Sequence, residues 1–136
     1  MIAFAEVRPQ HLHDVWSFVR DGLLAIIEKT NDDWIPEDVY HEVKAGVSAL
    51  FMIDNDDEQL GFVVLQVWPN YHAGPRLFVR AMWGSSGALV KHHDEINAQL
   101  RALALKCGAR TVRQNSPRNW DAVGWKRKQS IFELEV

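Results

Sequence analysis

A strand pattern that runs through a glycine turn into a long amphipathic helix is the feature that most constrains this chain. The strand pattern covers Leu77–Trp83, the turn covers Gly84–Gly87, and the helix pattern covers Ala88–Cys107. Another strand pattern, Arg110–Gln114, follows the helix. A helix between two strands of one sheet is a crossover, and crossovers join parallel neighbours. We therefore expect these two strands to run parallel, side by side, and to diverge at their carboxyl ends.

The same glycine turn predicts a place for an anion. Glycines let the backbone approach a ligand closely, and the first N–H groups of a helix point outward with a favourable dipole. A glycine turn also joins a strand to a helix for geometry alone. Both interpretations, an anion site and a plain connector, remain open at this point.

Periodicity elsewhere in the chain predicts a mixed sheet flanked by helices. Apolar residues recur at three- and four-residue steps in Gln10–Lys29, and a shorter helix should begin at Pro36 and end at Gly46. Strands are expected at Ile2–Val7, Ser48–Asp54, Gln59–Trp68 and Ser130–Val136, with a short helical turn at Pro117–Val123. The expected order is β-α-α-β-β-β-α-β-α-β, which predicts an α/β (α+β) fold with a mixed, mostly antiparallel sheet.

The length and the periodic positions together predict one core. A chain of 136 residues is long enough for one domain, so we expect residues 1–136 to form a single unit. The stripe on the last long helix also places Cys107 on its buried side. The residues expected in the core are Trp16, Val19, Leu23, Phe62, Val64, Ile96, Leu100, Leu103 and Phe132.

Charge and cysteine content exclude several classes of function. Fifteen Lys and Arg stand against 18 Asp and Glu, so a basic face for nucleic acid is not expected. The single cysteine excludes an internal disulfide and a multi-cysteine metal site, and it favours a reducing, cytoplasmic setting. We find no signal-peptide pattern and no run near the ~20 apolar residues that span a bilayer, so no membrane partner is expected.

Six tryptophans favour packing anchors or a partner surface, and a homodimer is the commonest closed assembly.

Several short motifs occur in a consistent order along the chain. They are Val7-Arg8-Pro9 with His13-Asp14-Val15, then Gly61-Phe62-Val63-Val64, then Asn115 after a strand, and Gly124-Trp125 before the last strand pattern. Together with the order and lengths of the elements, they resemble the GNAT superfamily of N-acetyltransferases over essentially the whole chain. Ser116-Pro117-Arg118, with a tryptophan soon after, is also similar to small GNAT-like proteins of tailed phages and prophages.

The resemblance implies a site for acetyl-CoA and an amine acceptor, with no metal. Backbone N–H groups of the glycine turn would hold the pyrophosphate, and two splayed strands would hold the pantetheine arm. The implied cofactor residues are Ala81, Met82, Trp83, Gly84, Ser85, Ser86, Gly87, Ala88 and Asn115. The candidates for the catalytic base are Glu28, late in the first helix, and His72, in the loop before the fourth strand. The plain alternatives are an exposed helix acid and a loop residue.

Two departures from the GNAT pattern keep a second function open. The superfamily's phosphate signature is Arg or Gln, two residues, Gly, one residue, and Gly or Ala, whereas this chain has Met82-Trp83-Gly84-Ser85-Ser86-Gly87-Ala88. The tyrosine that often protonates the departing thiolate is also missing, because only Tyr40 and Tyr71 occur. The resemblance implies an acetyl-CoA-dependent N-acetyltransferase. The alternative is a catalytically inactive GNAT-like binding or assembly module, encoded by a phage or prophage and acting with a virion or assembly partner in the host cytoplasm.

Overall fold

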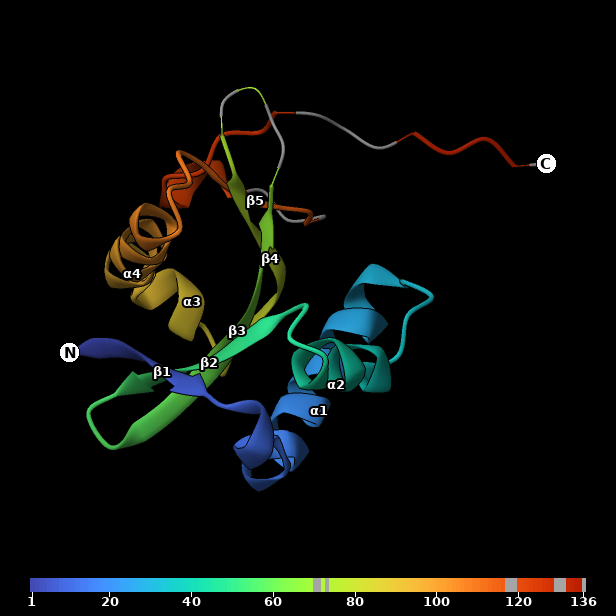
Figure 1. Ribbon diagram of the computed structural model, residues 1–136, viewed down its shortest axis with the longest axis vertical. Helices are drawn as coiled ribbons and strands as arrows, with labels where there is room; N and C mark the ends of the chain where they lie inside the picture. Colours follow the sequence, from blue (N-terminus) through green and yellow to red (C-terminus); the bar gives the residue numbers. More distant parts are fainter. Residues whose placement is uncertain (70–71, 73, 117–119, 129–131, 136) are drawn as a thin grey trace.

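A five-stranded sheet forms the centre of the computed structural model, which describes residues 1–69, 72, 74–116, 120–128 and 132–135 (Figure 1). Its strands lie in the order β1-β2-β3-β4-β5. The first four are antiparallel neighbours, and β4 and β5 run parallel. The elements are β1 (Ile2–Val7), the 3-10 turn η1 (Pro9–His11), α1 (Leu12–Thr30), α2 (Pro36–Lys44), β2 (Ala49–Asn55), β3 (Glu58–Trp68), β4 (Arg76–Gly84), α3 (Ala88–Lys91), α4 (His93–Lys106), β5 (Val112–Gln114) and the 3-10 turn η2 (Asp121–Val123). The expected fold class and the parallel crossover pair are confirmed.

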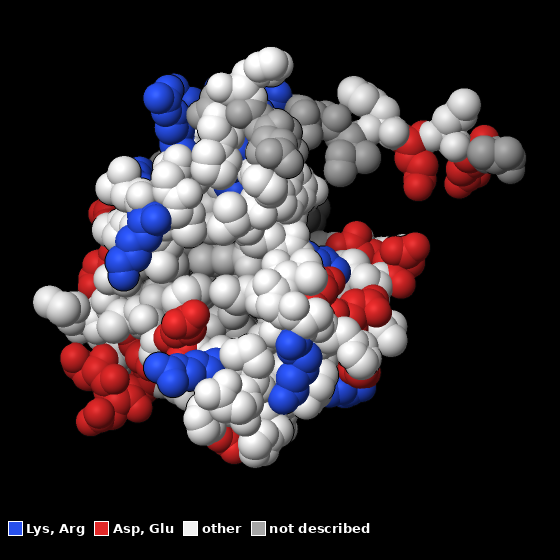
Figure 2. All heavy atoms as spheres, in the orientation of Figure 1, with Lys and Arg blue, Asp and Glu red and all other residues white. Residues whose placement is uncertain are grey.

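Helices cover both faces of the sheet, with α1 and α2 on one face and α3 and α4 on the other (Figure 1). The central strand β3 supplies both cores, because alternate side chains of a strand point to opposite faces. Phe62 and Val64 pack in the α1–α2 core, whereas Val63 and Leu65 pack in the α4 core. Figure 2 shows Lys and Arg side chains scattered among Asp and Glu on this face of the molecule, with no continuous basic patch. Among the described residues, no helix is both long and apolar enough to cross a membrane.

Local signals explain where α1 ends and where α2 begins. The first helix stops at Asn31, which adopts a left-handed conformation (φ 56°) and donates its N–H to the Ile27 carbonyl. The second helix begins at Pro36, and the Asp38 carboxylate accepts the N–H of Ile35 at 3.1 Å. The short loop between them is thereby fixed at both ends.

Two glycines allow close packing next to β4. A Cβ at Gly22 would collide with the ring of Phe62, so this glycine lets α1 lie directly on the sheet. A Cβ at Gly61 would collide with the carbonyl oxygen of Trp83 on the neighbouring strand. The Gly-Phe pair at the start of β3 therefore serves close contact with both α1 and β4.

The long helix expected at Ala88–Cys107 is wrong in one respect, because it is broken into α3 and α4 at His92. His92 leaves the helical region (φ −109°, ψ 23°), and the His93 imidazole Nδ1 lies 2.8 Å from the Val90 carbonyl. That carbonyl would otherwise accept the N–H four residues later. Neither Pro nor Gly occurs at the break, so the sequence carries no signal for it.

The prediction of a final strand at Ser130–Val136 is also wrong for the residues that the structure describes. Residues 132–135 form no strand, and Figure 1 shows them projecting away from the body. Phe132 and Leu134 are 93% and 89% exposed. Alternation fixes which side chains of a segment share a face, but a strand also needs a partner edge. The rest of Ser130–Val136, and residues 117–119 of the expected helical turn, lie outside the described residues.

The core predictions hold for most positions but not all. Confirmed as buried are Val19, Leu23, Phe62, Val64, Ile96 and Leu100. Trp16 and Leu103 are only half-buried, and Phe132 is exposed. Cys107 is exposed too, because the buried stripe of α4 runs through Ile96, Leu100 and Ala104 instead. All six tryptophans are half-buried.

Candidate functional site

A bulge in β4 opens the sheet at the place where the site forms. Val64 pairs with Ala81 and Leu65 pairs with Val79, so Arg80 is an extra residue with no partner in β3. The pairing of β4 with β5 ends at Val79 and Gln114, one residue before the bulge. A bulge bends its strand and increases the local twist. The two parallel strands therefore part immediately after Val79, as expected for their carboxyl ends.

A cleft of about 350 Å³ occupies the space between the parted strands and the end of α1. Its walls combine apolar and aromatic side chains with a nearly equal share of polar surface. Its lining residues are Ala25, Ile26, Lys29, Thr30, Asp32, Trp34, Phe78, Val79, Arg80, Ala81, Met82, Trp83, Gly84, Leu89, Gln114, Asn115, Ser116 and Trp120. A cleft in which apolar and aromatic side chains surround polar groups is the usual form of a small-molecule site.

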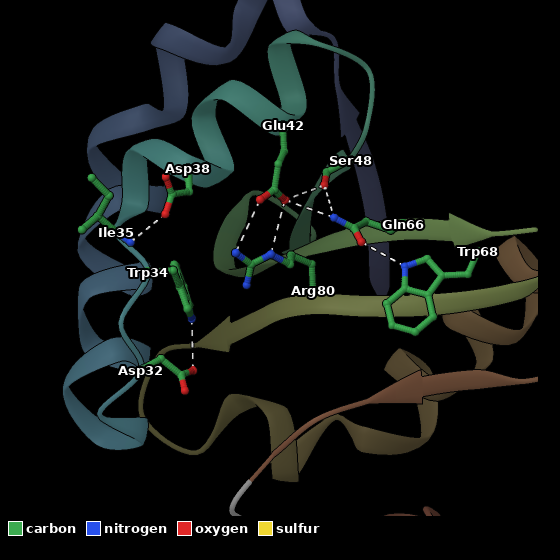
Figure 3. Close-up of polar contacts among 9 residues, drawn as sticks. All are labelled: Asp32, Trp34, Ile35, Asp38, Glu42, Ser48, Gln66, Trp68 and Arg80. Carbon is green, nitrogen blue, oxygen red and sulfur yellow. Dashed lines mark hydrogen bonds and ion pairs between the residues drawn. The ribbon is translucent and has the colours of Figure 1, made fainter. Parts of the chain in front are cut away.

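A polar network fixes the bulged arginine beside the cleft (Figure 3). Arg80 donates from Nε and Nη2 to the two oxygens of Glu42, at 3.3 and 3.4 Å. Ser48 Oγ and Gln66 Nε2 also donate to Glu42, at 2.9 and 3.1 Å. The guanidinium carbon lies 4.6 Å from the ring centre of Trp34, which is within cation–π range. Arg80 is held from both sides as a result.

Hydrogen bonds with Asn97 of α4 hold the chain at Val123 and Trp125, after β5. Asn97 donates from Nδ2 to the Val123 carbonyl at 2.8 Å and accepts from Trp125 Nε1 at 3.1 Å. Trp120 lies 6.4 Å from Trp125, ring centre to ring centre, and its Nε1 donates to Ser116 Oγ at 2.9 Å. The Gly124-Trp125 motif thus anchors the segment that brings Trp120 to the cleft.

No protein-family model and no curated protein sequence matches this chain. Solved structures, in contrast, match it over nearly its whole length. A ribosomal-protein-alanine N-acetyltransferase from Brucella melitensis is 13% identical, with a TM-score of 0.64, and 98% of this chain and 100% of that chain are covered. A predicted acetyltransferase with acetyl-CoA from Clostridium acetobutylicum is 10% identical, with a TM-score of 0.65 and coverage of 99% and 96%. AAC(6')-Iy, in complex with the bisubstrate analogue CoA-S-monomethyl-acetylneamine, is 16% identical, with a TM-score of 0.61 and coverage of 99% and 98%.

This chain has the GNAT fold. At these identities the likeness establishes the architecture alone.

The structure brings five of the implied GNAT cofactor residues to the cleft. Ala81, Met82, Trp83 and Gly84 line it from β4, and Asn115 lines it from the segment after β5. The indole of Trp83 is fixed as a wall, since it stacks on Phe62 at 6.0 Å and meets the Phe18 ring edge-on at 5.6 Å. Ser85, Ser86, Gly87 and Ala88 form the turn beyond this wall and do not line the cleft itself.

Two N–H groups of the GNAT glycine turn are already engaged. Ser85 donates to the Leu60 carbonyl and Ala88 donates to the Ser85 carbonyl, both at 2.8 Å. The N–H groups of Ser86 and Gly87 have no acceptor among the described residues. Gly87 has φ +74°, and a Cβ there would meet no atom within 4 Å, so the turn needs glycine for its backbone conformation. Because α3 has only four residues, any anion here would be held by N–H donors with little help from a dipole.

The candidate bases lie elsewhere than the cleft. Glu28 is exposed on α1 and His72 is exposed in the loop before β4, and neither is among the described residues that line the cleft. Tyr40 packs edge-on against Trp16 at 4.9 Å between α1 and α2, and Tyr71 lies outside the described residues. No group of three or more His, Cys, Asp or Glu in the described part of the chain is arranged to hold a metal.

Sequence reasoning missed the charged residues of the cleft. Asp32 and Trp34 come from the loop after α1, and Trp34 Nε1 donates to Asp32 Oδ2 at 3.0 Å. Lys29 lines the cleft from the last turn of α1. One sequence signal could have indicated Asp32 and Trp34, namely the polar run Thr30–Asp33 followed directly by a tryptophan. A tryptophan in a short polar loop usually packs against the body of the protein or contacts a ligand. Arg80 had no signal, because a bulge is invisible in a strand pattern.

Proposed function

We propose that this protein is an acetyl-CoA-dependent N-acetyltransferase that transfers the acetyl group to an amine. The observation that carries the proposal is the bulge at Arg80, which parts β4 from β5 and opens the lined cleft. The relatives in fold that contain acetyl-CoA or a coenzyme A analogue support it. The acceptor is taken up in the next subsection.

The cofactor would occupy the half of the cleft between the parted strands. Its pantetheine arm would lie between Met82 and Asn115, and its pyrophosphate would reach the turn beyond Gly84. The N–H groups of Ser86 and Gly87 are the donors left in the turn for the phosphates. Gln114, at the point where the strands part, has an Nε2 donor with no acceptor among the described residues. An amide carbonyl of the pantetheine arm would match that donor.

The transfer needs an oxyanion donor and a proton acceptor. The amine nitrogen bonds to the thioester carbonyl carbon, the carbon–sulfur bond breaks, coenzyme A leaves as its thiolate, and the proton lost from the nitrogen passes to a base. A backbone N–H at the β4 bulge is the donor we assign to the oxyanion. Asp32 is the carboxylate that lines the cleft, so we assign it to hold the ammonium and to take its proton. Glu28 and His72 stay as candidates that would need to move to reach the acceptor.

A second candidate function rests on a different observation. The N–H groups of Ser85 and Ala88 already donate to protein carbonyls. Among the described residues, no tyrosine lines the cleft. Both facts favour a GNAT-like binding or assembly module without catalysis, of the kind that the phage and prophage resemblance implies. Such a module would leave acetyl-CoA unbound or unreacted.

Calorimetry with acetyl-CoA on the full chain separates the two functions. The enzyme hypothesis requires binding, and release of coenzyme A must then increase when amines are added. Released coenzyme A is best followed by chromatography, because exposed Cys107 would react with a thiol reagent. Absence of binding would reject the enzyme and leave the module. Binding without amine-dependent release would point to a coenzyme A-binding module.

A further inference from the structure

Trp34 brings two opposite charges to one end of the cleft. Its indole N–H donates to the Asp32 carboxylate at 3.0 Å, while its ring face lies 4.6 Å from the Arg80 guanidinium carbon. The edge and the face of one ring therefore hold an anion and a cation (Figure 3). Asp32 and Arg80 both line the cleft.

The Arg80 side chain is fixed by its contacts, but not all of its N–H donors have an acceptor among the described residues. Its Nε and Nη2 atoms pair with Glu42, and its side chain is only 21% exposed. Its Nη1 atom has no acceptor among the described residues, and Figure 3 shows this third nitrogen pointing away from Glu42. A guanidinium keeps five N–H donors in a fixed fork, so the unpaired donors have a defined direction. They suit a planar anion such as a carboxylate.

The charges around this end of the cleft balance. Lys29 and Arg80 are cations, and Asp32 and Glu42 are anions. Glu42 is occupied by Arg80 and by its donors Ser48 and Gln66, so it is not offered to a ligand. A ligand therefore meets the Asp32 carboxylate, one oxygen of which accepts from Trp34, the Lys29 ammonium and the spare donors of Arg80. A molecule that carries both an amine and a carboxylate matches this arrangement better than a simple amine does.

Building on the proposed function, we infer that the acceptor is an amine that also carries a carboxylate. Arg80 Nη1, with Lys29 nearby in the cleft wall, binds the carboxylate, and Asp32 binds the amine. Glu42 is a positioning residue that fixes the guanidinium over Trp34. The acceptor class is amino acids or small molecules with the same two groups, and a simple alkylamine should be a poor ligand.

Ligand-observed saturation-transfer NMR with two matched mixtures tests this inference. One mixture contains α-amino acids and ω-amino acids of three to six carbons, and the other contains the carboxamide of each. Spectra are recorded with and without coenzyme A, and turnover with acetyl-CoA is measured in parallel. We expect the best carboxylate to bind at least about tenfold more tightly than its carboxamide, the ratio that one charge-assisted hydrogen bond supplies.

Variants assign the preference to Arg80. The paired change Arg80→Gln with Glu42→Gln removes both charges together and leaves no charge without its partner, so the protein should still fold. It should lower the carboxylate-to-carboxamide ratio by about 10- to 150-fold. Lys29→Gln, on an exposed residue, should lower it less. Arg101→Gln, on the exposed side of α4, is the matched control and should not change it.

Two outcomes overturn the inference. One is equal binding of carboxylates and carboxamides, or binding of neither, by the unaltered protein. The other is an unchanged ratio in both the paired variant and Lys29→Gln. A purely structural Arg80 would alter both mixtures alike and leave the ratio intact. Because the NMR measurement needs no acetyl transfer, failure of acetyl-CoA to bind would defeat the proposed function without deciding this result.

Discussion

The two halves of the cleft are built from different parts of the chain. The half toward the glycine turn is made by backbone: a bulge at Arg80, strands that part after Val79, and a turn with free N–H groups at Ser86 and Gly87. The half toward α1 is made by side chains, with Asp32, Trp34 and Arg80 in fixed contact. A backbone site can hold a common cofactor with varied sequence, whereas a side-chain site can discriminate between acceptors. The predictions below test that division of roles.

The largest effect is expected in the side-chain half, at the proposed base. Asp32→Asn keeps an acceptor for Trp34 Nε1 but removes the negative charge. A general base contributes about 10²- to 10⁴-fold, so kcat should fall by that factor while acetyl-CoA affinity stays unchanged. Asp33→Asn, on the exposed neighbouring residue, is the control. Equal losses in both variants, measured by steady-state kinetics, would remove Asp32 from the chemistry.

The next effect concerns the packing that supports the backbone half. Leu100 is 1% exposed and packs in the same core as Leu77 and Val79, below the point where the strands part. Leu100→Ala should lower the free energy of unfolding by about 2–5 kcal/mol. Phe132→Ala, at a residue that is 93% exposed, should leave it nearly unchanged. Urea titration of the two variants measures the contrast, and a large loss in Phe132→Ala would show that the C-terminal segment packs on the body.

The glycine turn offers a sharper test of the backbone half. Gly87 and Gly46 both have positive φ (+74° and +77°), and neither would bring a Cβ within 4 Å of another atom. Valine at either position therefore causes similar backbone strain, but only Gly87 lies where the phosphates would bind. Gly87→Val should weaken acetyl-CoA binding by about 1.5–3 kcal/mol for each lost contact, beyond the change in Gly46→Val. Calorimetry that finds the two variants equal would place the cofactor elsewhere.

A smaller effect is expected from the network that fixes Arg80. Glu42 accepts hydrogen bonds from Arg80, Ser48 and Gln66, and its side chain is 23% exposed. Glu42→Gln retains one acceptor and loses the charge, so we expect about 1–3 kcal/mol of destabilisation in thermal or urea unfolding. Acceptor selectivity should weaken while acetyl-CoA affinity is kept. Loss of acetyl-CoA affinity as well would mean that the two halves are not independent.

The smallest effect lies outside both halves, on the hairpin. Burial raises the pKa of Asp54 above its ordinary value near 3.8, and its Oδ1 has no partner among the described residues. A raised pKa in the folded state means that the charged form is the unfavourable one. At neutral pH the buried charge of Asp54 therefore destabilises the folded state. The free energy of unfolding should rise as the pH falls from the folded-state pKa toward 3.8, because the carboxyl group of the folded protein takes up a proton. Asp54→Asn should remove this dependence and stabilise the protein at pH 7 by no more than about 0.5 kcal/mol. Urea titrations between pH 4 and pH 7, with exposed Asp57→Asn as control, measure it.

Periodicity determined most of the fold because it reports which side chains share a face. The three- and four-residue steps in α1 predicted that Val19 and Leu23 are buried, and the crossover at Ala88–Cys107 predicted the parallel pair. The same reasoning failed at His92 and at residues 132–135. A carbonyl captured by the His93 side chain and the absence of a partner edge depend on neighbours that a local pattern does not describe.

The sequence by itself determined the order of elements, the strand pair that parts and the glycine turn beside it, since these follow from local conformation and short-range spacing. Only the tertiary structure decided where the charges meet. Asp32, Glu42 and Arg80 lie on a loop, a helix and a bulged strand, and their approach to one another depends on how α1 and α2 pack against β4. Likewise, the Leu60 carbonyl that engages Ser85 belongs to a neighbouring strand. Contacts between distant segments are set by packing, and packing is a property of the whole fold.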